Sequence, residues 1–162
     1  ILFAGKLLAY YGLYEDKQVS WLPSYGPEMR GGTCNCSVTI SDEPISSPLI
    51  LTPTTLIVMN TPSFNRFISS VQSNGRAFID SSLVEEKCER SDIECFYVPA
   101  TQLAADNNLK GMANIILVGK MLKETGVTSS EMIKKAMAKV IPPKKAALLE
   151  SNLKAIELGM AQ

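Results

Sequence analysis

Hydrophobic and polar positions follow two periodicities along this chain, one typical of helices and one typical of strands. Residues 1–14 repeat apolar side chains at helical spacing and predict a first helix. Residues 18–22 predict a short strand. Residues 33–41 alternate strictly, with Cys34 and Cys36 on the apolar face, and predict a strand whose other face is polar. That polar face meets solvent, a cleft or a subunit interface.

The middle of the chain predicts a strand, a capped helix and a second strand. Residues 55–59 are continuously apolar, which is typical of a strand buried on both faces. Asn60 or Thr61 then caps a helix over residues 63–71, and a strand follows at residues 76–79. Strand, helix and strand in this order predict a parallel pair. Asn60 is also a minor site candidate, because ligands gather at the carboxyl ends of such strands.

The last half of the chain is mainly helical. A charged surface segment at 81–94 precedes a short strand at 94–98. Thr128 and Glu131 form a capping box before another helix. Leu149, Leu153, Ile156 and Met160 form an apolar stripe that covers either the core or a neighbouring subunit. Two further helices are expected at 101–106 and from 111 to 119 and beyond.

Composition and element order together predict one α/β domain over residues 1–162, a Rossmann-like three-layer α/β/α sandwich with a mostly parallel or mixed sheet. The chain is 46% hydrophobic and 20% charged, as in globular proteins. Sixteen basic and sixteen acidic residues cancel, which disfavours nucleic acid as a partner. No apolar run is long enough to span a bilayer and no signal peptide is visible, so we expect a cytoplasmic protein.

Histidine and cysteine usage limits the chemistry available to the chain. There is no histidine, so the usual general base and the commonest metal ligand are absent. The four cysteines are Cys34, Cys36, Cys88 and Cys95, and their spacing matches no iron–sulfur motif. A four-cysteine zinc site is the alternative to reduced thiols, and we favour reduced thiols, with Cys34 and Cys36 as small buried residues.

The segment between the two predicted strands is the strongest candidate site. Arg30 stands before Gly31 and Gly32, which places a permanent cation beside accessible backbone N–H groups. This combination suits a phosphate or a carboxylate. The alternative is a rigid turn with one solvated arginine. Asn114 is a second candidate, since it is the polar side chain in the first turns of an apolar helix and either bonds the backbone or a ligand.

The same segment, Ser24-Tyr25-Gly26-Pro27-Glu28-Met29-Arg30-Gly31-Gly32-Thr33-Cys34-Asn35-Cys36, resembles the gamma subunits of the 2-oxoacid:ferredoxin (acceptor) oxidoreductases. It is most similar to the 2-oxoglutarate and branched-chain 2-oxoacid types. The resemblance continues through Gly5–Ala9, Ser41–Ile45, Met59–Ser63, Val98–Thr101, Ala113–Ile116 and Lys144–Ala155. The family normally begins with a strand and a Gly-Gly-Gln-Gly-type loop, neither of which precedes the first helix in this sequence.

The resemblance implies an activity and a set of partners. The family decarboxylates a 2-oxoacid oxidatively on thiamine diphosphate, passes electrons through iron–sulfur clusters to ferredoxin, and releases an acyl-CoA. Thiamine diphosphate and the clusters are expected in alpha, beta and sometimes delta partner subunits, so this chain alone is expected to hold none and to lack catalytic residues. In isolation it can form a homodimer through exposed apolar surface.

For the site, the resemblance implies a share in coenzyme A binding. Arg30 would hold a CoA phosphate, Gly31 and Gly32 would admit the backbone, and Thr33 would donate a hydrogen bond. Asn114 would bond the nucleotide or pantetheine part, with Ser24 and Tyr25 on the same wall. Two alternatives stay open: a structural assembly subunit whose Arg30 pairs with a partner carboxylate, and a free-standing nucleotide-binding protein.

Overall fold

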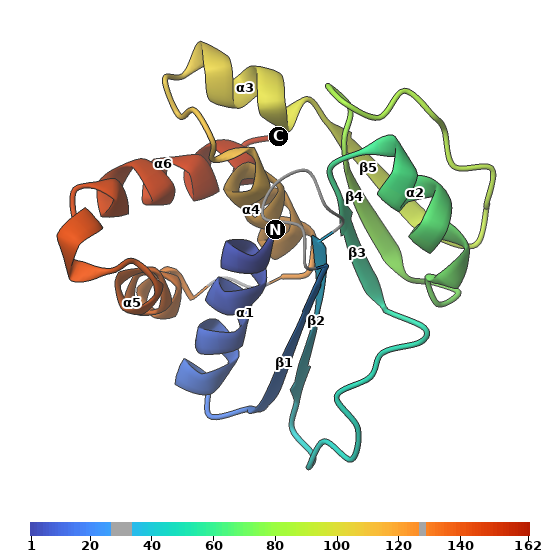
Figure 1. The fold of residues 1–162 in the computed structure, drawn as a ribbon, viewed down its shortest axis with the longest axis horizontal. Coiled ribbons are helices and arrows are strands. Elements are labelled where there is room, and N and C mark those ends of the chain that lie inside the picture. The colour runs from blue at the N-terminus through green and yellow to red at the C-terminus, as the bar shows by residue number, and fades with distance from the viewer. Residues whose placement is uncertain (27–33, 127–128) are drawn as a thin grey trace. The chain divides into compact units, whose positions relative to one another are not determined.

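The computed structural model describes residues 1–26, 34–126 and 129–162, which form two compact units. The hairpin unit comprises Ile1–Ile50 and Ser129–Leu149, and the sheet unit comprises Leu51–Thr128 and Glu150–Gln162. Both units are drawn in Figure 1. The assignment of residues 1–162 to a single gamma-subunit domain stays a prediction.

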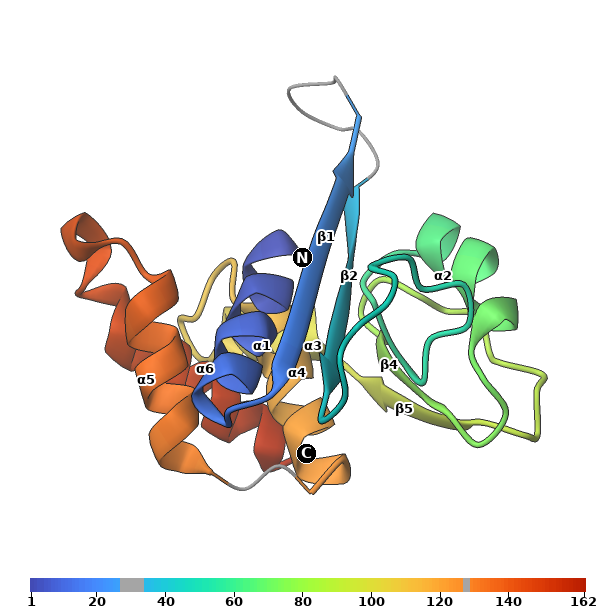
Figure 2. The ribbon, with the colours of Figure 1, turned by 90° about the horizontal axis from the view of Figure 1, so that it is seen from below.

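The hairpin unit is built on two long strands and two helices. Strand β1 (Gln18–Tyr25) pairs antiparallel with β2 (Cys34–Ser41), from Gln18 opposite Ser41 to Tyr25 opposite Cys34. Helix α1 (Leu2–Tyr14) lies along this hairpin, and α5 (Ser130–Val140) packs on the other side of α1, as Figure 2 shows. A short 3-10 turn, Pro143–Lys145, follows α5.

The predicted alternation of β2 determines which face α1 covers. A Cβ built on Gly5 of α1 would meet the side chains of Cys36, Trp21 and Val38, so these three residues share the covered face. β1 runs three residues further than the expected end at Leu22. It includes Pro23, which β1 tolerates because the hairpin leaves edge positions that need no donor.

The sheet unit holds a parallel three-stranded sheet in the order β3 (Thr55–Val58), β4 (Arg76–Asp80) and β5 (Glu94–Val98). Helix α2 (Thr61–Phe67), extended by a 3-10 turn at Ile68–Ser70, lies on one side of this sheet, and α4 (Ala113–Glu124) lies on the other (Figure 1). The α/β class and the parallel strand pair predicted from the sequence are therefore confirmed. The described strands form two sheets, one antiparallel and one parallel.

Alternation along the strands separates the two buried faces of this sheet. On the α2 face, Val58, Ala77 and Ile79 form a cluster with Phe64 of α2. On the α4 face, Phe78 stacks on Phe96, with ring centroids 5.0 Å apart. Both faces are apolar because both are covered by helices, which explains the continuous apolar run of β3.

Two helices complete the sheet unit. Helix α3 (Ala100–Asp106) contacts α4, and α6 (Leu148–Met160), which begins at the boundary of the two units, packs on α4 through Gly159 and Ile156. The predicted apolar stripe is only partly buried. Ile156 is buried, whereas Leu149, Leu153 and Met160 stay partly exposed, because the inward face of α6 is formed by Asn152, Ala155, Ile156 and Gly159. Gly159 lets the two backbones touch.

Two helix starts differ from the sequence prediction. Helix α4 begins at Ala113, two residues later than the expected Gly111, and continues to Glu124. Helix α5 is capped by Ser129, whose Oγ accepts a hydrogen bond from the Met132 N–H at 3.4 Å. Thr128, the predicted cap, lies outside the described residues. The cap at Asn60 is confirmed, since its Oδ1 accepts from the Ser63 N–H at 2.9 Å.

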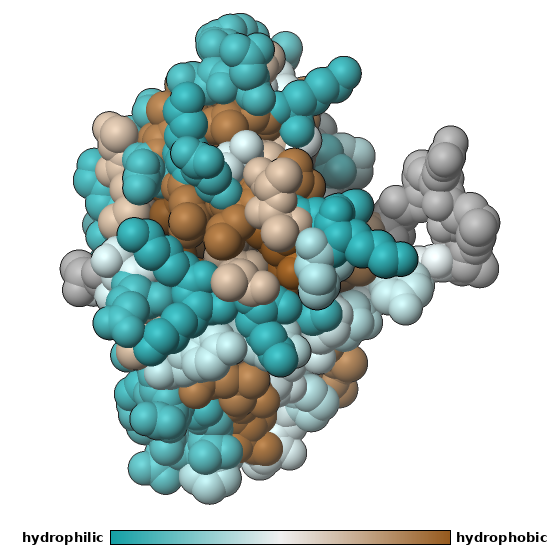
Figure 3. Space-filling view, turned by 90° about the vertical axis from the view of Figure 1, so that its left-hand side faces the viewer, coloured by the Kyte–Doolittle hydropathy of each residue, from teal (hydrophilic) through white to brown (hydrophobic). Residues whose placement is uncertain are grey.

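The surface exposes large hydrophobic side chains as well as polar ones. One face, shown in Figure 3, has hydrophobic side chains gathered between hydrophilic ones. The most exposed large hydrophobic side chains are Leu51, Tyr25, Leu49, Leu13 and Leu83, all more than half exposed. Within the described residues, no helix is both long and apolar enough to cross a bilayer.

Candidate functional site

The end of the β1–β2 hairpin presents the first group of predicted site residues. Ser24 and Tyr25 are the last residues of β1, and both are exposed, Tyr25 by 69%. They lie opposite Asn35 and Cys34 respectively. Arg30, Gly31, Gly32 and Thr33 lie outside the described residues. The strands on both sides of that segment are paired in register, which confirms the two predicted strands.

Strand alternation gives Ser24 and Tyr25 different surroundings. Tyr25 and Cys34 belong to the set of positions that α1 covers further along the hairpin, whereas Ser24 and Asn35 belong to the opposite, polar set. The two residues therefore do not form one continuous wall, although each presents a hydroxyl group to solvent at the hairpin end. A ligand held by the connecting segment could use one of them on each side.

The prediction that Cys34 and Cys36 are buried is wrong for Cys34, which is exposed, and Cys36 is only half-buried. The reason lies in the extent of α1. The Cys36 Sγ is 4.0 Å from the carbonyl oxygen of Ile1, so α1 begins level with Cys36. Cys34 is two residues nearer the hairpin end, where α1 no longer covers the strand. Burial also raises the pKa of the Cys36 thiol.

Asn114 lies in the first turn of α4 and is partly exposed, which corrects the expectation that it is buried. Leu117 and Val118, three and four residues further on the same helix face, are fully buried, so the partial exposure of Asn114 is confined to the first turn of the helix. Within the described residues its amide makes no side-chain hydrogen bond. The helix start is not capped by a side chain either, since the N-cap residue is Met112. This end of α4 therefore has donors and an acceptor available for a ligand.

The carboxyl end of β4 is occupied by an aspartate that sequence reasoning missed. Asp80 is fully buried and accepts hydrogen bonds from the Thr101 Oγ at 2.6 Å, the Thr101 N–H at 3.2 Å and the Ser82 N–H at 3.1 Å. It joins β4 to the start of α3, whose N-cap residue Pro99 has no side-chain donor or acceptor. Its role is structural, because all its described partners belong to the protein backbone or to Thr101. The sequence signal was an aspartate at the end of an apolar strand.

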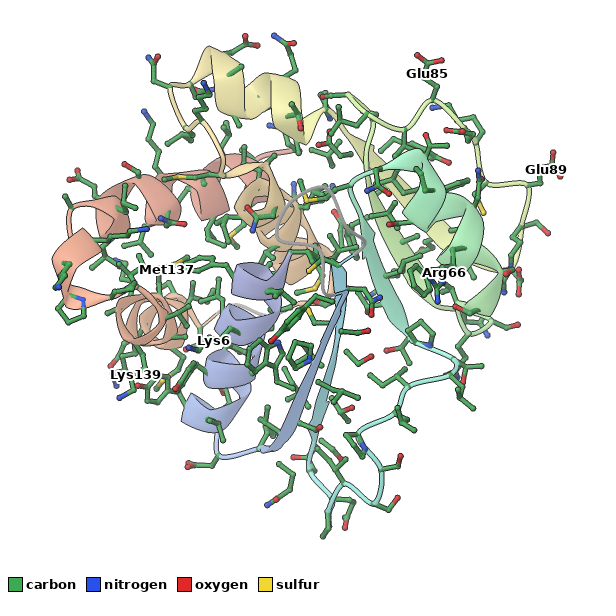
Figure 4. The ribbon with its side chains drawn as sticks, in the orientation of Figure 1. Lys6, Arg66, Glu85, Glu89, Met137 and Lys139 are labelled. Carbon is green, nitrogen blue, oxygen red and sulfur yellow. The ribbon has the colours of Figure 1, made fainter. Side chains whose placement is uncertain are left out.

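Two grooves were also not predicted. One, of about 500 Å³, is lined by Thr61, Leu83, Glu85 and Glu86, and the Glu86 carboxylate accepts from the Thr61 hydroxyl at 2.8 Å. Figure 4 shows Glu85 on the outer edge of the segment that follows β4. Two carboxylates make this groove unsuitable for a phosphate.

The second groove lies in the hairpin unit and has a volume of about 280 Å³. Its lining combines one cation with aromatic and aliphatic side chains: Lys6, Ala9, Tyr10, Leu13, Val19 and Trp21. The Lys6 ammonium lies 6.0 Å from the ring centre of Tyr10, one helical turn away. The sequence signal for this groove was the spacing of Lys6 and Tyr10, since residues four apart share a helix face.

Comparison with known proteins identifies the family. The family model for pyruvate ferredoxin/flavodoxin oxidoreductase matches residues 1–162, the whole of the chain. The chain belongs to this family. The resemblance carried by the segment around Arg30 is therefore confirmed.

Curated members of the pyruvate ferredoxin/flavodoxin oxidoreductase family include close counterparts of this chain. It is 31% identical to the 2-oxoglutarate synthase subunit KorC of Methanocaldococcus jannaschii, over 98% of this chain and 85% of that protein. It is 32% identical to the ketoisovalerate oxidoreductase subunit VorA of Methanothermobacter marburgensis, where it spans 98% of this chain but only 33% of that protein. The predicted kinship with 2-oxoglutarate and branched-chain 2-oxoacid types agrees with both.

Solved structures of family members share the fold. The gamma subunit of a keto/oxoacid ferredoxin oxidoreductase from Geobacter sulfurreducens matches 99% of this chain and 89% of its own, with a TM-score of 0.80 and 28% identity. The 2-oxoglutarate:ferredoxin oxidoreductase of Magnetococcus marinus, solved with 2-oxoglutarate, coenzyme A and succinyl-CoA, matches 98% of this chain and 28% of its own. At 18% identity and a TM-score of 0.83, that second match shows a common fold. The chain is thus a gamma-subunit-type member of an oxidoreductase family.

Proposed function

We propose that this chain is the gamma subunit of a multi-subunit 2-oxoacid:ferredoxin oxidoreductase and takes part in binding coenzyme A. The enzyme would decarboxylate a 2-oxoacid oxidatively, form an acyl-CoA and pass electrons to ferredoxin. The observation that carries the proposal is the family match over the whole chain, together with relatives that are themselves subunits of such enzymes.

The coenzyme A contact is assigned first to the segment at the hairpin end. Arg30 would bind a CoA phosphate, because a guanidinium matches phosphate geometry with two parallel hydrogen bonds. Gly31 and Gly32 would admit the backbone close to that phosphate, and Thr33 would donate a hydroxyl hydrogen bond. Support comes from the paired strands on both sides, which present the exposed hydroxyls of Ser24 and Tyr25 next to this segment.

Asn114 is assigned separately to the nucleotide or pantetheine part of coenzyme A. Its amide can donate and accept at once, which suits the amide groups of pantetheine and the edge of an adenine ring. Support comes from its partial exposure and from the lack of a side-chain hydrogen bond to any other described residue.

Thiamine diphosphate and iron–sulfur clusters are assigned to partner subunits, alpha, beta and in some enzymes delta. The chain has no histidine, and its described residues contain no group of three or more metal-binding side chains. We place the complex in the cytoplasm, where reduced thiols persist, and all four cysteines are free thiols in this structure.

The test compares two half-reactions in the assembled complex after replacement of Arg30 by alanine. We expect acyl-CoA formation to lose about tenfold or more, the cost of one charge-assisted contact of roughly 1.5–3 kcal/mol, while thiamine-dependent decarboxylation stays near its original rate. Arg66→Ala is the matched control, since Arg66 is an exposed arginine on α2 whose described contact is only with the neighbouring Phe67 ring. Equal loss in both half-reactions would contradict a CoA role.

Asn114 has its own test, a titration of the complex with coenzyme A. Asn114→Ala should raise the KM for CoA several-fold, in line with about 1 kcal/mol for a neutral hydrogen bond, and leave the KM for the 2-oxoacid unchanged. Asn65→Ala, which removes an exposed amide from α2, should change neither value. An unchanged KM for CoA in Asn114→Ala would remove Asn114 from the site.

A structural assembly role is the second candidate, and exposed hydrophobic side chains favour it. Leu51 and Leu49 are 83% and 68% exposed, which suits burial against a partner subunit. In that case Arg30 would pair with a carboxylate of the partner. The distinguishing result is co-purification: Arg30→Ala would then release the chain from its complex, whereas a CoA-binding Arg30 leaves the complex intact. Tight dinucleotide binding by the chain without partners would instead support a free-standing nucleotide-binding protein.

A further inference from the structure

The segment between β4 and β5 brings two cysteines together on the α2 face of the sheet. Cys95 lies in β5, and Cys88 lies in the segment before it. The Cys88 N–H donates to the Tyr97 hydroxyl at 2.8 Å, and Tyr97 shares its strand face with Cys95 because the two are two residues apart. Both cysteines also pack against one hydrophobic cluster, formed by Val58, Phe64, Ala77, Ile79 and Val84.

Charged hydrogen bonds fasten this segment in place. The Arg90 Nη1 donates to the carbonyl oxygens of Ile68 at 3.1 Å, Ser69 at 3.2 Å and Val71 at 2.7 Å. Its Nε and Nη2 donate to the two carboxylate oxygens of Asp92, at 2.9 and 2.7 Å. The guanidinium therefore anchors the backbone around Cys88 to the end of α2. The backbone at Cys88 is held at β5 by its own N–H bond to the Tyr97 hydroxyl and, two residues on, by Arg90.

The surroundings of the two thiols differ in a way that assigns them different roles. Burial, followed by the interaction with the Cys88 side chain, raises the pKa of Cys95 to about 12. Cys95 therefore stays a thiol near neutral pH and is a poor first nucleophile. Both thiols are partly exposed, and the positive charge of Arg90 acts on both sulfurs. Cys88 lies in the irregular segment outside the sheet, whereas Cys95 is held in β5, so the first attack is assigned to Cys88.

We propose that Cys88 and Cys95 are a redox-active pair that forms a reversible internal disulfide by exchange with an oxidised small-molecule thiol. The Cys88 thiolate attacks one sulfur of the disulfide and forms a mixed disulfide, releasing one thiolate. Cys95 then loses its proton to solvent and attacks the Cys88 sulfur, releasing the second thiolate. Two protein thiols are oxidised and one disulfide is reduced to two thiols, so atoms and electrons balance.

The bond would join the segment before β5 to β5 itself, next to Arg90 and the end of α2. Intracellular disulfides outside hyperthermophiles are usually transient and serve catalysis or redox sensing, and a partly exposed pair fits that class better than a buried structural bond. Cys34 offers a natural contrast within the chain, since it is an exposed thiol at the hairpin end.

The experiment treats the full-length protein, native and reduced, with oxidised glutathione, and then blocks remaining thiols by alkylation. Peptide mapping by mass spectrometry should show one Cys88–Cys95 crosslink without glutathione on either residue, and full reversal by dithiothreitol, whether or not the exposed Cys34 takes up glutathione. Cys95→Ser should trap glutathione on Cys88. Cys88→Ser should leave Cys95 unmodified, and Cys34→Ser, the matched control, should still form the crosslink.

The wild-type protein alone can overturn the proposal, so the test does not depend on whether a variant folds. Free thiols at both Cys88 and Cys95 after treatment, with glutathione attached only at Cys34, would exclude an exchange-active pair. Stable glutathione on Cys88 of the wild type, without a crosslink, would show that Cys95 cannot reach it and would equally overturn the proposal.

Discussion

Two helix contacts in this molecule depend on glycine, and they differ in what each glycine meets. In the sheet unit, a Cβ on Gly159 of α6 would lie 1.9 Å from the carbonyl oxygen of Ile116, and one on Gly119 of α4 would lie 2.2 Å from that of Ile156. In the hairpin unit, a Cβ on Gly12 of α1 would meet side-chain carbons of Val19 and Ile40, at 2.9 Å and more. Backbone cannot move aside, whereas side chains can rotate.

The difference explains what each unit can do. The α4–α6 contact holds the sheet unit in one geometry, because two backbones at van der Waals distance leave no other arrangement. The hairpin is covered by α1 through side chains, which can adjust while the strands carry an exposed end with Ser24 and Tyr25. A rigid sheet unit and an adaptable hairpin are consistent with the proposed function, in which the hairpin end contributes to coenzyme A binding.

The largest expected effect on the free energy of unfolding comes from adding a methyl group at the α4–α6 contact. Gly159→Ala should lower the free energy of unfolding by about 3 kcal/mol, since the new methyl group forces the helices apart. Urea unfolding followed by circular dichroism measures it. Gly111→Ala is the matched control, because Gly111 has open space around it and a φ of 82°, so it should cost only about 1–2 kcal/mol of backbone strain. Equal losses would show that the contact is not close.

A smaller effect is expected at the α1–hairpin contact. Gly12→Ala should change the free energy of unfolding by no more than about 1 kcal/mol in either direction, because alanine favours the helix by about that amount and the side chains of Val19 and Ile40 can shift. The same urea titration applies. A loss as large as that of Gly159→Ala would mean that the hairpin is as rigid as the α4–α6 contact.

The smallest expected effect on stability comes from an ion pair and not from packing. Arg90 and Ser73 donate to the Asp92 carboxylate and hold its pKa below the ordinary value of 3.8. The ionised carboxylate is therefore favoured in the folded protein. Its contribution to the stability of the fold is complete above the pKa of Asp92 in the unfolded chain, and it is lost as the pH falls toward the lower pKa in the folded protein. Because Arg90 and Asp92 are both accessible to solvent, the contribution is small.

Asp92→Asn should thus reduce stability slightly near neutral pH, and the difference from the wild type should shrink as the pH falls below about 3.8. Thermal unfolding at a series of pH values measures this difference. Asp106→Asn is the control, since the Asp106 carboxylate accepts from Gln102 on its own helix. A difference that grows on acidification would reverse the assigned sign.

Local patterns in the sequence predicted most elements correctly. The alternation of β2 and the apolar run of β3 gave the right strands, because in each case the pattern reflects which faces are covered. The Asn60 cap could also be predicted, since a cap bonds only three residues away. The segment that carries Arg30 was singled out by its composition and by its likeness to the family. The comparison confirms the family, and the site role of the segment stays a prediction.

Predictions of burial were less successful, because burial depends on where another element ends. Cys34 is exposed since α1 begins level with Cys36, and no pattern within the strand indicates that limit. Asn114 lies among apolar residues and is still partly exposed, because it stands in the first turn of its helix. The inward face of α6 runs through Asn152, Ala155, Ile156 and Gly159 and not through the leucines of the stripe, because the close backbone contact with α4 is made at Gly159.

The sequence by itself determined most strands and helices, the two strands on either side of the Arg30 segment and the family, since each rests on residues that are near one another in the chain. Only the tertiary structure decided that Asp80 joins β4 to α3 and that Cys88 meets Cys95 beside Tyr97. Those relations connect residues whose spacing follows no helical or strand period. They arise because the parallel crossover and the anchored segment after β4 bring these side chains together.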